Sequence, residues 1–260
     1  MKAEIVSVGT ELLLGEIVDT NASYLSQKLA GLGIDVHYRH TVGDNLARLA
    51  EVISTALGRA DAVLLTGGLG PTEDDLTREA IAAATGQPLV RVPESEARLR
   101  EFFAARNRPL ADSNLKQADA PIGASHIENV CGTAPGIFMR WQGKLIFAAP
   151  GPPVELREMA ERFIIPALRQ ELGSSEGQLF SRSLQLMNIG ESQVADVLGD
   201  IISAQTDPTL ALYASPANVR IRMATKAADE QEAQAKFAPL EARIRELLDN
   251  MAGILVDEVV

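Results

Sequence analysis

Hydrophobic and polar positions alternate between two patterns along the first 170 residues or so. Short apolar runs predict buried strands, and apolar residues at helical spacing predict amphipathic helices. The strand candidates are 5–8, 34–42 and 62–65, and the helix candidates are 21–31, 46–57 and 76–84. This alternation predicts a mostly parallel sheet with helices on both faces.

The pattern changes in the second half of the chain. Residues 93–115 are predicted to be helical, 136–141 and 144–148 to form a hairpin, and 154–168 to form another helix. Small polar residues at 172–177 indicate a linker.

The remainder predicts a small α+β domain with the order βαββαβ. Its elements are expected at 179–187, 192–202, 210–214, 219–225, 229–251 and 254–257. The sequence therefore predicts two domains, an α/β domain over 1–172 and the smaller domain over 177–260.

Composition and charge limit which partners and which cellular compartment we expect for the protein. The net charge of −11 over 260 residues argues against broad, nonspecific binding of nucleic acid. The single cysteine, Cys131, is typical of a reducing compartment, and its lack of a general base nearby in sequence favours a packed thiol. No signal segment or membrane-spanning run is recognisable, so we expect a cytoplasmic protein with no membrane partner.

Polar or glycine-rich segments follow each predicted strand of the parallel sheet. They are 9–11, 42–45, 66–77 and 149–155. Because ligands of open parallel sheets bind beyond the carboxyl ends of the strands, these segments are expected to converge on one site.

The segment 66–77 carries the strongest chemical signal. It contains Gly67, Gly68 and Gly70 between a strand and a helix, where bare backbone N–H groups and the helix dipole suit a phosphate. Asp74 and Asp75 follow at once, beside Glu73. Acidic side chains beside an anion-binding backbone are compatible if a divalent cation such as Mg²⁺ bridges them.

Two of the acidic residues have a structural interpretation as well as a functional one. Asp75 could complete a capping box with Thr72, or it could bind metal and orient water. Asp44 could cap the helix that begins at Leu46, or share that metal with Asp75. Arg78 either pairs with one of the acids or reaches a phosphate.

Residues near the first strand have the same ambiguity. Thr10 and Glu11 belong either to a mobile acidic surface loop or to a lip over a nucleotide. Asn21 lies in a cluster that is most simply a helix cap. The three histidines show no metal-ligand spacing.

The motifs together resemble one family, the competence/damage-inducible CinA family. The resemblance rests on 9–15, 19–21, 42–44, 66–75, 132–136 and 150–155. In that family the amino-terminal region belongs to the MoaB/Mog-like molybdopterin-binding superfamily, and the tail from about 177 resembles its small KH-like middle domain. The carboxyl-terminal amidase domain of full-length CinA has no counterpart in this sequence, so deamidase activity is not expected.

The resemblance implies a three-layer α/β/α fold and metal-dependent ADP-ribose pyrophosphatase activity, giving AMP and ribose 5-phosphate. The acidic positions that are functional in related proteins match Asp44 and Asp75. The family motif often reads Thr-Gly-Gly-Thr-Gly, whereas Leu69 stands at its fourth place here. Pterin-type recognition is correspondingly less favoured.

The resulting hypothesis assigns a role to each residue. Asp44 and Asp75 are catalytic, and Asp44, Asp74 and Asp75 hold Mg²⁺ or another divalent ion. The expected substrate-binding residues are Thr10, Glu11, Asn21, Gly67, Gly68, Gly70, Thr72, Pro150 and Gly151. Asp75→Asn is expected to lose most turnover with little change in melting temperature.

Two alternatives remain open. The first is a molybdopterin-binding protein or adenylyltransferase of molybdenum cofactor synthesis. The second is a non-catalytic regulatory or nucleic-acid-binding module built on the second domain. That domain lacks the Gly-x-x-Gly loop that clamps RNA, with only Gly190 near the expected place. Nucleic acid is therefore not an expected partner, and the domain is expected to mediate homo-oligomerisation, most simply as a dimer.

Overall fold

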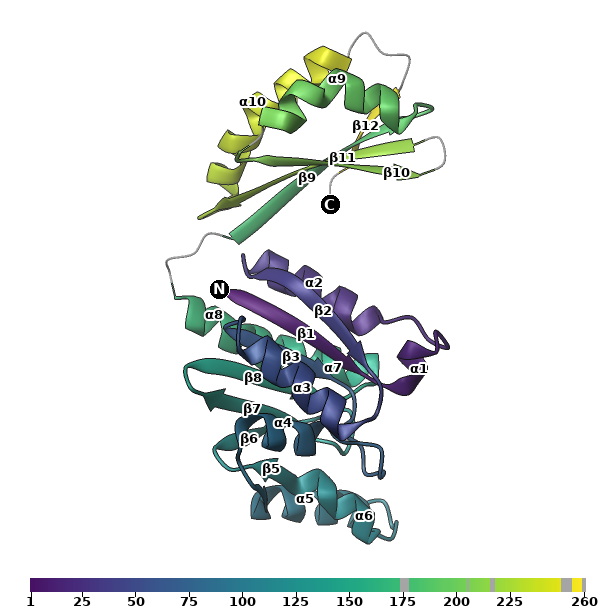
Figure 1. The fold of residues 1–260 in the computed structure, drawn as a ribbon, viewed down its shortest axis with the longest axis vertical. Helices are drawn as coiled ribbons and strands as arrows, with labels where there is room; N and C mark the ends of the chain where they lie inside the picture. Colours follow the sequence, from purple (N-terminus) through teal and green to yellow (C-terminus); the bar gives the residue numbers. More distant parts are fainter. Residues whose placement is uncertain (174–177, 205, 216–217, 249–253, 259–260) are drawn as a thin grey trace. The chain divides into compact units, whose positions relative to one another are not determined.

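The chain divides into two compact units (Figure 1). The computed structural model describes residues 1–173, 178–204, 206–215, 218–248 and 254–258. The first unit comprises Met1–Ala30 and Ile34–Gly173, and the second comprises Gly31–Gly33 and Ser174–Val260. Most of the predicted linker, residues 174–177, lies outside the described residues. No helix in the described parts of the chain is long and apolar enough to cross a membrane.

The first unit is built on a six-stranded sheet. In spatial order its strands are β2 (Asp35–Val42), β1 (Lys2–Val8), β3 (Ala62–Thr66), β8 (Lys144–Ala149), β7 (Gly136–Trp141) and β6 (Ala124–Ile127). The first four are mutually parallel, and β7 and β6 add antiparallel pairings at one edge. The prediction of a mostly parallel sheet is confirmed.

Helices α3 (Leu46–Leu57) and α4 (Thr77–Thr85) cover one face of this sheet. Leu49 and Ile53 of α3 and Ile81 of α4 share a core with Val6 of β1 and Ile146 of β8. Residues two apart on a strand point to the same face, which is why alternate strand positions supply this core.

Helices from two other parts of the unit cover the other face. They are α2 (Thr20–Gly31) and a continuous segment made of α7 (Pro153–Met159), the π-helical η2 (Ala160–Ile164) and α8 (Ile165–Leu172). Phe163 of η2 packs edge-on against Phe138 of β7, with ring centroids 5.6 Å apart. Phe138 in turn stacks on Phe147 of β8, so the three layers of the predicted α/β/α fold are present.

The sequence did not predict the short elements correctly. The predicted helix over 93–115 is two helices, α5 (Pro93–Ala104) and α6 (Asp112–Leu115), with Asn107 in the left-handed region at φ 50° between them. The segments that were not predicted are α1 (Thr10–Leu13), η1 (Lys116–Ala118), β4 (Leu89–Arg91), β5 (Asp119–Pro121) and β6. These pieces of three or four residues are too short to show a hydrophobic period.

The second unit is the α+β domain that the pattern predicted. Its elements are β9 (Gln178–Met187), α9 (Glu191–Ala204), β10 (Thr209–Ser215), β11 (Asn218–Ala227), α10 (Glu230–Leu248) and β12 (Ile254–Glu258). The antiparallel sheet has the order β10-β11-β9-β12. Val194 of α9 and Phe237 of α10 pack with Ile221 of β11 in one core. The predicted end of the last helix, 249–251, lies outside the described residues.

Candidate functional site

A cleft of about 380 Å³ lies where the parallel strands of the first unit end. The segments that follow β1, β2, β3 and β8 all contribute to its walls. Asp44 and Asp75, which are 31 positions apart in the sequence, both line it. The parallel topology brings them together because it places every strand-to-helix crossover at the same edge.

Asp44 is held by the turn that follows β1. Its Oδ2 accepts hydrogen bonds from the backbone N–H of Thr10 at 3.0 Å and from the Thr10 hydroxyl at 2.7 Å. Asn45, not Asp44, caps α3, accepting from the N–H of Arg48 at 3.1 Å. The capping interpretation of Asp44 is therefore wrong. Its Oδ1 accepts no hydrogen bond from the described residues, and Thr10 positions Asp44 without itself lining the cleft.

The glycine-rich loop after β3 is packed tightly against β1. Gly67 has φ +101°, and a Cβ added there would lie 2.2 Å from the carbonyl oxygen of Val8. Its N–H donates to the carbonyl of Ala149 at 3.0 Å, and the N–H of Gly70 donates to Asp75 at 2.7 Å. These two amides are therefore not free for a phosphate. The amides of Gly68 and Leu69 have no acceptor in the described parts of the chain and remain available.

The Asp75 carboxylate stabilises this loop by hydrogen bonds to its backbone. Besides the N–H of Gly70, its carboxylate accepts the N–H of Thr72 at 2.9 Å and the Thr72 hydroxyl. Helix α4 begins only at Thr77, and its N-cap residue Leu76 makes no side-chain cap. The predicted pairing of Thr72 with Asp75 is present, but it lies in the loop before the helix and does not cap α4. Asp75 lines the cleft while all its contacts stabilise the loop.

Arg78 lies beneath the same loop and is fully buried. Its guanidinium donates to the carbonyl of Leu69 and, at 3.3 Å, to the carbonyl of Gly70. Burial lowers the pKa of Arg78 to about 10, so it stays charged at neutral pH. The predicted ion pair of Arg78 with one of the acids is not present in the described parts of the chain. Arg78 binds backbone carbonyls and thereby fixes the shape of the loop.

A second hollow of about 350 Å³ adjoins the cleft, and Glu11 and Gly151 line both. Asn21 lines the hollow and donates to the Thr66 hydroxyl at 2.9 Å and to the carbonyl of Gly151 at 2.7 Å. Its Oδ1 is buried and has no donor among the described residues. Pro150 lines the cleft itself, and its carbonyl accepts from Thr66 at 3.3 Å.

Glu155 and Gln117 are among the cleft residues that were not assigned a role from the sequence. Glu155 of α7 lines the cleft and accepts from the Asn129 side chain at 2.7 Å. Gln117 of η1 also lines it, with a buried Oε1 that has no partner among the described residues. Glu155 follows the same proline- and glycine-rich turn as Gly151, which could have revealed it. Gln117 gave no signal, because no predicted strand precedes it.

Five carboxylates line the cleft, and the sequence predicted a metal ion among three of them. They belong to Glu11, Asp44, Asp74, Asp75 and Glu155. No group of three or more His, Cys, Asp or Glu side chains in the described residues converges closely enough to cage a metal. Mg²⁺ needs no such cage, since it usually binds one or two carboxylates plus substrate phosphates and water. The free Oδ1 of Asp44 fits that requirement.

The first unit, a mostly parallel sheet with a glycine-rich, acidic cleft, is a domain of the molybdopterin-binding class. A family model described as "Probable molybdopterin binding domain" matches residues 4–170, and one described as "Damage-inducible protein CinA KH domain" matches residues 181–252. The crystal structure of the protein CinA from Thermoplasma acidophilum superimposes with a TM-score of 0.60 at 32% identity, covering 66% of this chain and 98% of that one.

Curated relatives agree with this classification. A competence-damage inducible protein of Symbiobacterium thermophilum is 51% identical over 94% of this chain and 58% of its own length. That of Caldicellulosiruptor saccharolyticus is 45% identical over 95% of this chain and 60% of its own length. The chain thus spans about three fifths of the length of these relatives, and it belongs to the CinA family.

Proposed function

We propose that this protein hydrolyses the diphosphate of ADP-ribose in a reaction that needs a divalent metal ion. The observation that carries the proposal is the cleft itself, in which five carboxylates surround a glycine-rich loop. Such a cleft repels a bare diphosphate, because like charges at short range disfavour one another. Acidic side chains and a phosphate ligand become compatible when a cation lies between them.

Each residue then has a defined part in the reaction. Asp44 would hold the metal ion through Oδ1, while Thr10 fixes the position of its carboxylate. When bound, the metal would neutralise phosphate charge and lower the pKa of a bound water. The amides of Gly68 and Leu69 would donate to a phosphate oxygen, and Asp75 would keep those amides in place. Water would add to one phosphorus as the bridging P–O bond breaks, giving AMP and ribose 5-phosphate.

The adenosine half would occupy the second hollow. Glu11 lies where this hollow meets the cleft, in position to accept hydrogen bonds from ribose hydroxyls. The unpartnered Oδ1 of Asn21 offers a further acceptor on the wall. A buried acceptor without a donor costs free energy, which a ligand N–H or O–H group would recover.

The test is release of AMP from ADP-ribose by the purified chain. We expect turnover with Mg²⁺, loss of turnover with a chelator, and recovery when Mg²⁺ is restored. Asp44→Asn should lose most activity, whereas Asp200→Asn, an exposed change in the second unit, should not. Full turnover by Asp44→Asn or in the presence of chelator would reject the proposal.

A second candidate follows from the family model that matches residues 4–170. The same cleft would bind molybdopterin, whose phosphate could use the glycine-rich loop. Leu69, in place of the hydroxyl-bearing residue common in that motif, disfavours this alternative. Calorimetric titration with molybdopterin and with ADP-ribose separates the two candidates, and binding of the pterin alone would reverse our ranking.

A further inference from the structure

A third hollow, which we call the α5–β6 cavity, lies next to the cleft. Its volume is about 480 Å³, and it lies between one side of α5 and the residues at and after the end of β6. Thr133 lines both this cavity and the cleft, so the two spaces meet at that residue. The cavity is larger than the cleft, and the terminal ribose of ADP-ribose would leave most of it empty.

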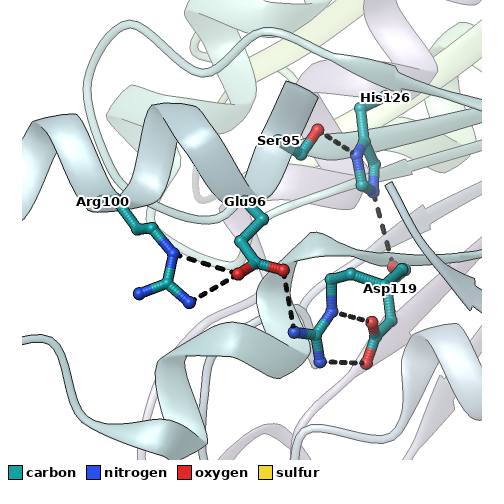
Figure 2. A network of polar contacts seen from close by, with 6 residues as sticks. Ser95, Glu96, Arg100, Asp119 and His126 are labelled. Carbon is teal, nitrogen blue, oxygen red and sulfur yellow. Dashed lines mark hydrogen bonds and ion pairs between the residues drawn. The ribbon is translucent and has the colours of Figure 1, made fainter. Parts of the chain in front are cut away.

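Ser95 and His126 line the cavity, and hydrogen bonds connect Ser95 to His126 and His126 to Asp119 (Figure 2). His126 Nε2 lies 3.4 Å from the backbone carbonyl of Asp119, which can only accept, so Nε2 carries the proton. His126 Nδ1 is then the acceptor for the Ser95 hydroxyl, 2.5 Å away. With its proton committed to His126, Ser95 presents only lone pairs to a ligand.

The surroundings keep this arrangement in place. Arg91 pairs with the Asp119 carboxylate and also bonds Glu96 at 3.3 Å, which ties β5 to the start of α5. Burial lowers the pKa of His126 to about 4, so the ring stays neutral at physiological pH. The wall therefore offers a stable acceptor rather than a charge that varies with pH.

The remaining wall is aromatic and charged, with carboxylates and one guanidinium. Phe102 lines the cavity, and the guanidinium of Arg106 lies 3.6 Å from its ring centroid. Glu101, Glu128 and Arg98 also line it, and the Arg98 guanidinium lies 3.8 Å from the Glu128 carboxylate. An aromatic face with hydrogen-bond acceptors suits a planar base that carries amino or carboxamide donors.

We propose that the α5–β6 cavity binds a second nucleoside, so that the preferred substrates are diphosphate-linked dinucleotides. This inference rests on the proposed function of the cleft. Water adds to one phosphorus, the bridging P–O bond breaks, and two nucleoside monophosphates leave with release of a proton. The far base stacks near Phe102 and donates to Ser95, while the diphosphate lies in the cleft.

The test compares kcat/KM for NAD⁺, diadenosine diphosphate and ADP-ribose. The wild-type chain should favour both dinucleotides over ADP-ribose. Because Phe102→Ala removes the aromatic side chain near which the far base stacks, it should lower kcat/KM for the dinucleotides about fivefold or more. It should change kcat/KM for ADP-ribose less than twofold. Ser95→Ala should act in the same direction.

Arg100→Ala is the matched control, since Arg100 lies on α5 but pairs with Glu96 and does not line the cavity (Figure 2). Thermal unfolding of each variant checks that it is folded. A wild-type preference for ADP-ribose, or an equal effect of Phe102→Ala on all three substrates, would overturn the inference.

Failure of the proposed function gives a different result, namely no hydrolysis of any of the three. Calorimetric titration with NAD⁺ then tests whether the cavity binds a base, independently of any hydrolysis. A dissociation constant raised about fivefold or more by Phe102→Ala and unchanged by Arg100→Ala supports the cavity as a base-binding site. An absence of binding, or equal binding by the wild type and Phe102→Ala, rejects it.

Discussion

Replacing Asp75 by asparagine tests whether this residue holds the glycine-rich loop. The carboxylate accepts the N–H of Gly70 on one oxygen, and the N–H and hydroxyl of Thr72 on the other. An asparagine amide has a single oxygen and an NH₂ group that can only donate. In either orientation the NH₂ group faces at least one backbone N–H, so a hydrogen bond becomes a donor–donor contact.

The expected cost follows from these contacts. A hydrogen bond to a charged acceptor contributes about 1.5–3 kcal/mol, and the loop is partly exposed, so we expect a loss of about 2 kcal/mol. For a domain of this size, that loss lowers the melting temperature by about 4–8 °C. This differs from the expectation from the sequence alone, which was little change in melting temperature.

The assay uses Trp141, the single tryptophan of the chain, which lies in β7 of the first unit. Its fluorescence during urea unfolding reports the stability of that unit for the wild type, Asp75→Asn and Asp44→Asn. Asp44→Asn is the matched control, because both Thr10 donors reach one oxygen that an amide can supply. We expect the control to cost less than about 1 kcal/mol. Wild-type stability in an inactive Asp75→Asn would refute the reasoning and favour a directly catalytic Asp75.

Three further predictions concern glycine geometry, pH and metal binding. Gly67→Ala should destabilise the first unit by more than about 3 kcal/mol, since the added methyl would meet a carbonyl oxygen 2.2 Å away. Gly123→Ala, at φ +87° with nothing within 4 Å, should cost only about 1 kcal/mol in the same urea titration. Because the pKa of His126 falls to about 4 on folding, the unfolded state binds more protons below pH 6.5, and stability should decrease by about 2 kcal/mol from pH 7 to pH 5. His126→Gln should remove that decrease and the exposed His37→Gln should keep it, so an unchanged pH profile in His126→Gln would contradict the assignment. Asp44→Asn should also raise the Mg²⁺ concentration for half-maximal ADP-ribose hydrolysis about tenfold, and an unchanged value would exclude Asp44 as a metal ligand.

The fold was largely predictable from the sequence because the spacing of apolar residues indicates which positions of a strand or helix are buried. The runs at β1 and β3 are buried on both faces, as parallel strands require, and α3 shows a clear amphipathic period. Strand β6 was not predicted, because Ser125 and His126 interrupt its apolar pattern and its order comes from pairing with β7. Such tertiary stabilisation leaves no local signal.

The candidate site was predictable at the level of segments and less so at the level of atoms. Topology alone indicates that the segments holding Asp44 and Asp75 converge. Which carboxylate oxygen of Asp44 is free depends on the hydrogen bond from Thr10, which lies 34 positions away in the sequence. Such long-range hydrogen bonds follow from tertiary packing. The capping-box interpretation of Asp75 needed a helix that begins at Glu73, directly after Thr72, whereas α4 begins at Thr77.

The buried guanidinium of Arg78 has a consequence for how ligands bind. It holds two loop carbonyls from inside the protein, so the backbone amides have their final orientation before any ligand arrives. The conformational entropy of ordering this loop is lost during folding and does not weaken later association. Side chains on the rim of the cleft can therefore be exchanged to alter ligand preference while the backbone of the glycine-rich loop keeps its shape.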